Sequence, residues 1–79
     1  MEITIVGTGC TKCKKLEETV REVVGEQGVD ASINKMTDIK EIAQTGILMT
    51  PGLIIDGKVK VAGKLPSKAE VEKIIESSK

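Results

Sequence analysis

Residues 7–13 read Gly-Thr-Gly-Cys-Thr-Lys-Cys, and the position of this C-x-x-C stretch decides the fold. Residues 2–6, just before it, are mostly β-branched and partly alternate between apolar and polar side chains, which predicts a strand. From Thr11 to about Gln27, apolar side chains recur at helical spacing, which predicts a helix with one buried face. These side chains are Cys13, Leu16, Val20, Val23 and Val24. The cysteine pair therefore lies where a strand passes into a helix.

The two sulfurs are expected to meet at the start of that helix. Cys10 falls at the N-cap and Cys13 one turn inside, and positions three apart on a helix lie on neighbouring rows. Because Cys13 also belongs to the apolar stripe, we expect it to be shielded and Cys10 to be exposed. Free backbone N–H groups and the helix dipole stabilise a thiolate at the N-cap, which lowers the pKa of Cys10 below the value of about 8.5 for a free cysteine. Such a thiolate attacks a disulfide, and Cys13 then resolves the mixed disulfide.

This chemistry needs no bound cofactor, because both electrons reside in the two sulfurs. Other uses of two cysteines have less support in the sequence. A disulfide that closes a loop of only four residues contributes little to the stability of a fold. Loop entropy gives roughly 2 kcal/mol of stabilisation for it, against about 3 kcal/mol for a 15-residue loop. A structural zinc site needs four ligands, and a chain without histidine supplies two thiolates. Two alternatives stay open: a Cu(I) carrier, since two thiolates hold Cu(I) in a near-linear pair, and a non-catalytic thiol redox sensor.

Three lysines stand in the first turn of the predicted helix, at positions 12, 14 and 15. Cations there oppose the helix dipole at a cost of about 0.3–1 kcal/mol each when exposed, so stability alone would favour aspartate or glutamate. Functional sites often depart from the residue preferences that stabilise a helix, and these positive charges would help to stabilise a nearby thiolate. For Lys14 and Lys15, a solvated helix face is an equally good interpretation. For Lys12, which lies between the cysteines, we favour a functional role.

The middle of the chain predicts a short strand and a short helix. Residues 29–34 alternate between apolar and polar side chains, as in a half-buried strand. Asp38 and Glu41 have the spacing of a capping box that opens a helix, and Gly46 ends that helix.

The last third of the chain predicts a hairpin followed by a helix. Residues 53–55 form an apolar strand, and the Asp-Gly pair at residues 56–57 is a strong signal for a two-residue turn. Residues 58–61 alternate lysine with valine. This is expected for an exposed edge strand, on which lysines hinder pairing with a strand of another molecule. Ser67 and Glu70 form a second capping box. The apolar face of the helix that follows comprises Val71, Ile74 and Ile75.

These elements follow one another in the order β-α-β-α-β-β-α. A strand, a long helix and a second strand predict a right-handed crossover and parallel pairing, and the later hairpin adds an antiparallel edge. A chain of 79 residues supports one domain, which is expected to span residues 1–79. The sequence therefore predicts an α/β fold in which a four-stranded mixed sheet packs with three helices.

The composition excludes several classes of function. Twelve basic residues balance twelve acidic ones, whereas proteins that bind nucleic acid or membrane surfaces carry a basic face. Phenylalanine, tyrosine and tryptophan are absent, so no aromatic side chain can stack on a base. No apolar run approaches the roughly 20 residues that span a bilayer, and nothing before the first strand reads as a signal peptide. We therefore expect a cytoplasmic monomer that binds neither nucleic acid nor membrane.

Three features together resemble the thioredoxin/glutaredoxin superfamily: the Cys-Thr-Lys-Cys motif at residues 10–13, the later Thr50-Pro51 pair and the order of the elements. Over nearly its whole length, the chain is most similar to the small thioredoxin-like redox-active disulfide proteins of archaea and anaerobic bacteria. The Gly-x-x-Cys-x-x-Cys spacing also resembles the heavy-metal-associated domain of copper carriers. That family usually has methionine where Thr8 stands and ends in a strand, whereas this chain is expected to end in a helix.

The thioredoxin resemblance implies a thiol-disulfide oxidoreductase in which Cys10 is the attacking nucleophile and Cys13 the resolving thiol. It further implies a cis peptide bond between Thr50 and Pro51 that packs beside the disulfide and presents backbone to the substrate.

The same resemblance implies a substrate surface and partners. We expect Gly9, Thr11 and Lys12 to contact the substrate together with Thr50 and Pro51. The implied substrates are disulfide-bearing proteins, and a thioredoxin-reductase-like enzyme, linked to flavin or ferredoxin, would supply the electrons.

Overall fold

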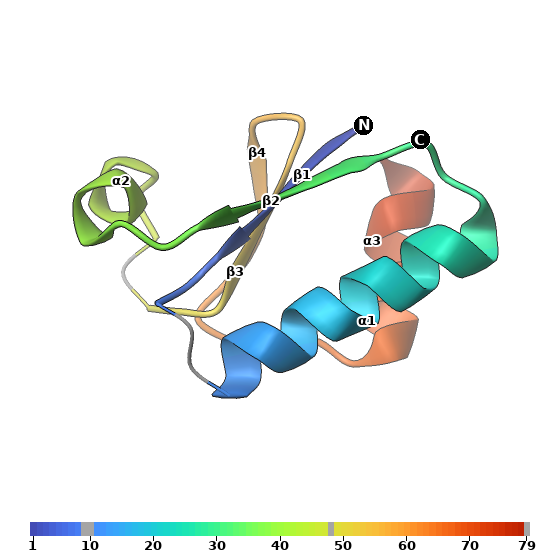
Figure 1. Cartoon of the computed structure of the whole chain (residues 1–79), viewed down its shortest axis with the longest axis horizontal. Helices are drawn as coiled ribbons and strands as arrows, with labels where there is room; N and C mark the ends of the chain where they lie inside the picture. Colours follow the sequence, from blue (N-terminus) through green and yellow to red (C-terminus); the bar gives the residue numbers. More distant parts are fainter. Residues whose placement is uncertain (9–10, 48, 79) are drawn as a thin grey trace.

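The computed structural model describes residues 1–8, 11–47 and 49–78, and within them it contains seven elements in the expected order (Figure 1). These are β1 (Glu2–Val6), α1 (Thr11–Gln27), β2 (Ser32–Met36), α2 (Ile39–Gln44), β3 (Gly52–Ile55), β4 (Lys58–Ala62) and α3 (Lys68–Ser77). The predicted order β-α-β-α-β-β-α is confirmed.

The four strands form one mixed sheet in the order β2-β1-β3-β4. The crossover through α1 pairs β1 with β2 in parallel, and Ile5 lies opposite Lys35. The other pairings, β1 with β3 and β3 with β4, are antiparallel. The sheet therefore has the parallel crossover and the antiparallel edge that the sequence predicts.

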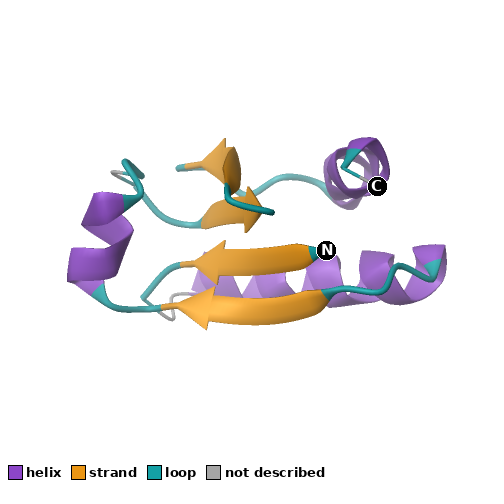
Figure 2. Cartoon of the chain, turned by 90° about the horizontal axis from the view of Figure 1, so that it is seen from above, coloured by secondary structure: helices purple, strands orange, loops and turns teal. Residues whose placement is uncertain are grey.

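Helices α1 and α3 pack on the same face of the sheet (Figures 1 and 2). Their buried side chains and those of β1, β3 and β4 form one aliphatic core, whose members are Ile3, Ile5, Leu16, Val20, Val23, Leu53, Ile55, Val61, Val71 and Ile75. A smaller cluster joins Val6 to Ile42 of α2 and to Ile47. In Figure 2, α2 lies beyond one end of the strands, so it does not form a second layer over the sheet.

Helix α1 buries the apolar stripe that its sequence predicts. Four of its residues, namely Cys13, Leu16, Val20 and Val23, are buried, and Val24 is half-buried. Charged residues occupy its other faces. In the part of the chain that the structure describes, no helix is both long and apolar enough to cross a bilayer.

The turn between β3 and β4 is the predicted Asp-Gly hairpin. Asp56 and Gly57 have φ angles of 50° and 81°, the positive values that a type I′ turn requires at both central residues. Asp56 also exchanges two hydrogen bonds with Glu2 at the start of β1. The Asp56 carboxylate accepts from the Glu2 N–H at 2.8 Å, and the Asp56 N–H donates to the Glu2 carbonyl at 2.8 Å. The turn is thereby fixed to the central strand.

Both predicted helix caps form, and one differs in its partner. At the start of α3, Ser67 accepts a hydrogen bond from the Glu70 N–H at 3.2 Å, as the capping box predicts. At the start of α2, Asp38 accepts from the Lys40 N–H at 2.8 Å rather than from Glu41. An N-cap oxygen can reach the second or the third helical N–H, and here the second is the donor.

The boundary predicted for the second strand is wrong. The alternation of side chains predicts the strand at residues 29–34, but β2 begins at Ser32 and ends at Met36. The Val29 N–H donates to the Val24 carbonyl at 3.1 Å, so the chain is still completing the end of α1 at that point. Val29 and Ala31 nevertheless pack against the core, which explains their apolar character.

A bulge alters the predicted alternation in β4. Leu53 pairs with Val61, but the next residue, Ile54, pairs with Val59, so the register shifts between them. Val61 is buried and Val59 is 46% exposed. The lysine-valine alternation was therefore a correct signal for an edge strand and a poor guide to which valine is buried.

We predict that Ile75→Ala lowers the free energy of unfolding by about 2–5 kcal/mol, because truncating this fully buried α3 side chain leaves a cavity in the main core. Ile39→Ala removes the same atoms at the start of α2, where the side chain is 74% exposed, and should change stability by less than about 0.5 kcal/mol. Urea unfolding followed by circular dichroism measures both. Equal losses in the two variants would contradict the packing of α3.

Candidate active site

The site predicted from the cysteine motif lies where three segments converge: the end of β1, the start of α1 and the loop before β3. Gly9 and Cys10 lie outside the described residues, so their predicted positions are not tested. Thr11 and Lys12 begin α1 and are both exposed. The start of this helix is therefore accessible to a partner molecule.

Cys13 lies in the first turn of α1 and is 5% exposed, as its place in the apolar stripe predicts. It packs directly against Gly7, the residue that follows β1. A Cβ atom at Gly7 would overlap the Cys13 sulfur, would lie 2.9 Å from the Cys13 Cβ, and would lie 3.9 Å from the Thr50 Cβ. The Gly7 N–H donates to the Met36 carbonyl at 2.9 Å, which extends the β1–β2 ladder to the site. Only a glycine permits this approach of helix to strand.

The loop before β3 brings the predicted proline to the same place. The peptide bond between Thr50 and Pro51 is cis, as the thioredoxin resemblance implied. Pro51 is buried, Thr50 is half-buried, and the Pro51 carbonyl accepts a hydrogen bond from the Gly63 N–H at 3.0 Å. Cys13 and Thr50 thus both lie close to Gly7, although they are far apart in the sequence.

A cavity of about 110 Å³ adjoins Cys13 between α1 and the β1–β2 side of the sheet. Its lining residues are Ile5, Gly7, Cys13, Lys14, Glu17, Lys35 and Thr37. Polar and charged side chains therefore lie near Cys13, which also packs against Gly7 at the end of β1.

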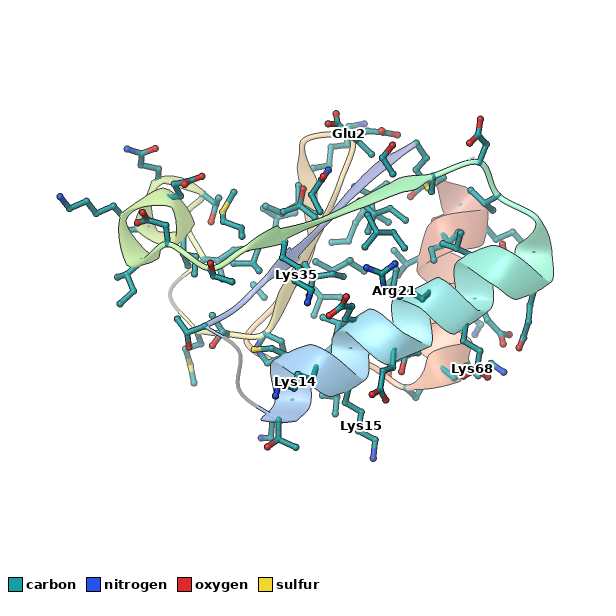
Figure 3. All side chains as sticks on the ribbon, in the orientation of Figure 1. Glu2, Lys14, Lys15, Arg21, Lys35 and Lys68 are labelled. Carbon is teal, nitrogen blue, oxygen red and sulfur yellow. The ribbon has the colours of Figure 1, made fainter. Side chains whose placement is uncertain are left out.

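An ion-pair network forms one wall of this cavity. Lys35 Nζ lies 3.0 Å from Glu17 Oε1, and Arg21 Nη2 lies 2.9 Å from Glu17 Oε2. Figure 3 shows Lys35 and Arg21 between β2 and α1. Hydrogen bonds from Lys35 and Arg21, with the attraction of their charges, hold the pKa of Glu17 below its ordinary value of 4.5. The carboxylate therefore stays ionised and keeps Lys35 at the cavity.

The structure distinguishes two of the helix-start lysines. Lys14 lines the cavity beside Cys13, which favours the functional interpretation of this residue. Lys15 is exposed and points away from the sheet in Figure 3, which favours a solvated face. Neither lysine forms an ion pair within the described ranges.

Three residues of this site were not predicted from the sequence: Gly7, Glu17 and Lys35. The spacing of Glu17 and Arg21, four apart on a helix, was a visible ion-pair signal. The contribution of Lys35 had no local signal, because it reaches Glu17 only through the pairing of β2 with β1. The role of Gly7 depends on how closely α1 approaches the sheet, which a pattern of residue types does not reveal.

A shielded cysteine in the first turn of a helix that follows β1, with a cis proline bond in a loop that reaches the same glycine, defines a thioredoxin-like redox protein. The chain belongs to the thioredoxin family, since the family model described as thioredoxin domain matches residues 1–76. The predicted membership of a small thioredoxin-like family and the predicted fold class are both confirmed.

Relatives from archaea agree with this assignment. A thioredoxin of Methanothermobacter thermautotrophicus is 43% identical over 75 residues, which cover 95% of this chain and 97% of that protein. A thioredoxin of Methanocaldococcus jannaschii is also 43% identical over 75 residues, covering 95% of this chain and 86% of that protein. A probable thioredoxin of Archaeoglobus fulgidus is 33% identical over 73 residues, covering 89% of this chain and 79% of that protein.

We predict that Gly7→Ala destabilises the fold by about 1–3 kcal/mol, because the added methyl group overlaps Cys13 and forces α1 away from the sheet. Gly25→Ala provides the matched control. Gly25 lies within α1 and has open space around it, so the same substitution should stabilise by about 0.5–1 kcal/mol. Urea unfolding measures the change in the free energy of unfolding for both variants, and the two changes should have opposite signs. A neutral Gly7→Ala would show that the helix does not need this close approach.

We predict that Glu17→Gln lowers stability at neutral pH and that this difference disappears in acid. The folded-state pKa of Glu17 is lowered, so its contribution is complete above the ordinary value of 4.5 and is lost as the pH falls through the lower folded value. Glu18→Gln alters the adjacent residue, which forms no ion pair in the described part of the chain, and should leave the acid dependence unchanged. Urea midpoints measured between about pH 7 and pH 2 test this. A difference that is constant with pH would contradict the ion-pair network.

Proposed function

We propose that this member of the thioredoxin family is a dithiol-disulfide oxidoreductase that exchanges electrons with protein disulfides through Cys10 and Cys13. The observation that carries the proposal is the position of Cys13, which is shielded in the first turn of α1 and packs on Gly7, close to which Thr50 also lies. A resolving thiol needs this shielding from solvent oxidants and from competing disulfides, together with a fixed position near the N-cap.

The proposed reaction has two exchange steps. The Cys10 thiolate attacks one sulfur of a substrate disulfide, forms a mixed disulfide and releases the other substrate sulfur as a thiolate. Cys13 then loses its proton and attacks the Cys10 sulfur. The bond between Cys10 and the substrate breaks, the second substrate thiolate leaves, and the Cys10–Cys13 bridge remains. Two electrons pass to the substrate, and a reductase returns two electrons to the bridge.

The substrate is proposed to bind across the start of α1 and the cis proline. Thr11 and Lys12 are exposed there, and they would contact the substrate together with Gly9. Thr50 and Pro51 would present backbone to the extended segment that carries the disulfide. The Pro51 carbonyl is bound by the Gly63 N–H, so this loop is held in place before a substrate arrives.

The proposed partners are disulfide-bearing proteins and a thioredoxin-reductase-like electron donor. The relatives that share 43% of their residues with this chain are named thioredoxins, which supports both. We further propose that the protein acts as a monomer in the cytoplasm.

The alternative of a Cu(I) carrier loses one of its two grounds, the resemblance to a domain that ends in a strand, since the last element that the structure describes is α3 and the chain belongs to the thioredoxin family. Its other ground, the two thiolates, is shared with the proposal, and anaerobic titration with Cu(I) distinguishes the two functions. Redox sensing without turnover differs from the proposal in one measurable respect, since a sensor does not reduce a disulfide substrate repeatedly.

We predict that the protein catalyses reduction of insulin disulfides by dithiothreitol and that Cys10→Ser abolishes this activity, because the attacking sulfur is lost. Cys13→Ser is expected to retain the first attack and to accumulate a mixed disulfide with a substrate, which intact-mass spectrometry detects. Insulin precipitation gives the rate. Wild-type activity in Cys10→Ser would remove Cys10 from the nucleophile role, and a single turnover in the wild type would favour the sensor.

A further inference from the structure

We propose that the three lysines at the start of α1, Lys12, Lys14 and Lys15, form a basic docking surface for partner proteins whose disulfide is flanked by acidic residues. This inference rests on the proposed function and names the class of substrate that the same site takes. The basic surface acts while the two proteins associate, and both exchange steps between the sulfurs stay as they are.

Helix α1 carries its charges in the reverse of the order that stabilises a helix. Its first five residues include three lysines and no acidic residue, and the remaining twelve include four glutamates and one arginine. The helix dipole favours acidic residues at the start and basic residues at the end, so this order costs stability. Helices α2 and α3 instead carry an acidic residue in the first turn, Glu41 and Glu70. Among the described helices, the reversal is therefore confined to the one that begins at the redox site.

The three lysines are available to a partner. All of them are exposed, and none forms an ion pair within residues 1–8, 11–47 and 49–78. By contrast, Lys64 and Lys68 are each paired with glutamate. Lys12 and Lys15 are three residues apart and so lie on the same side of α1, and Figure 3 shows Lys14 and Lys15 at the start of the helix. Their positive charges are therefore open to charges on another molecule.

The neighbouring segments compensate these charges only in part. On α1 itself, Glu17 is bound by two cations, and Glu18 is exposed without an ion pair in the described part of the chain. Residues 49–51 are uncharged, and the loop after β4 adds Lys64. Residues 38–44, which form α2 and its cap, carry two acidic residues and one lysine. The start of α1 is therefore a local positive surface on a chain whose net charge is zero.

This surface fits an acidic partner. Lys12 follows Cys10 by two residues, so a disulfide that reaches Cys10 brings its own flanking residues close to the lysines. Acidic flanking residues are then attracted, which speeds the encounter and orients the partner. A second copy of this chain would bring the same lysines against one another and would be repelled. Because the lysines are exposed, the attraction should weaken at high ionic strength.

The test compares two disulfide substrates that differ only in the charge beside the disulfide. Each consists of two short peptides joined by one disulfide, with a fluorophore on one peptide and a quencher on the other, and with either glutamate or lysine on both sides of each cysteine. Reduction separates the peptides and raises the fluorescence, and the chain has no aromatic side chain to add background. The reduced protein is mixed with each substrate, and the second-order rate constant is divided by that of dithiothreitol. This division removes the intrinsic difference in reactivity between the two substrates.

We expect the wild type to favour the glutamate-flanked substrate by about threefold to tenfold at about 0.02 M salt, and this preference to fall to less than about twofold at about 0.5 M. Lys12→Glu combined with Lys15→Glu should reverse the preference at low salt. Glutamate suits the start of a helix, so this double variant should be at least as stable as the wild type, which urea unfolding checks. Lys14 is left unchanged because it also lines the cavity beside Cys13.

Lys58→Glu combined with Lys60→Glu is the matched control, because it changes the net charge by the same amount. Both lysines are exposed on β4, at an edge of the sheet, and neither forms an ion pair among the described residues, so the preference of the wild type should be kept. Equal normalised rates in the wild type, an unchanged preference in the α1 double variant, or the same reversal in the control would overturn the inference and leave the proposed function intact. Failure of the wild type to reduce either substrate would overturn the proposed function, and the inference with it.

Discussion

The contact between Cys13 and Gly7 is the constraint on which the rest of this site depends. It joins the first turn of α1 to the end of β1 so closely that a Cβ at Gly7 would overlap the cysteine sulfur. Gly7 is in turn fixed to β2 by its hydrogen bond to the Met36 carbonyl. The position of the Cys13 sulfur is therefore set by the sheet, and the start of α1 is held at a defined place on the surface.

The distribution of the core supports that arrangement. Helices α1 and α3 cover one face of the sheet with an aliphatic core, which holds α1 along its length through Leu16, Val20 and Val23. The first turn of α1 extends to the end of β1, where Thr50 of the cis Thr50-Pro51 bond also lies close to Gly7. Rigid elements thus hold the shielded cysteine, while Thr11 and Lys12 stay open to partners. Precise placement of reacting groups by a packed scaffold is what exchange between two sulfurs requires.

Much of the fold could be predicted because its signals are local. The stripe in α1, the Asp-Gly turn and the Ser67 cap each depend on residues close together in the chain, and each is found in the structure. The start of β2 and the bulge in β4 were missed because hydrogen bonds to α1 and β3 decide them. At the site, Cys13 was predicted from its stripe, and the cis bond at Pro51 came only from family resemblance. Lys35 was missed because sheet pairing alone brings it to α1.

The central claim is that Cys10 is a stabilised thiolate at the start of α1 while Cys13 is shielded, and pH-dependent alkylation tests it most directly. The reduced protein is treated with limiting iodoacetamide between about pH 4 and pH 10, and peptide mass spectrometry assigns the modified sulfur. Modification is expected at Cys10, with a midpoint below the value of about 8.5 for a free cysteine. Equal modification of both cysteines, or a Cys10 midpoint at or above that value, would contradict the claim.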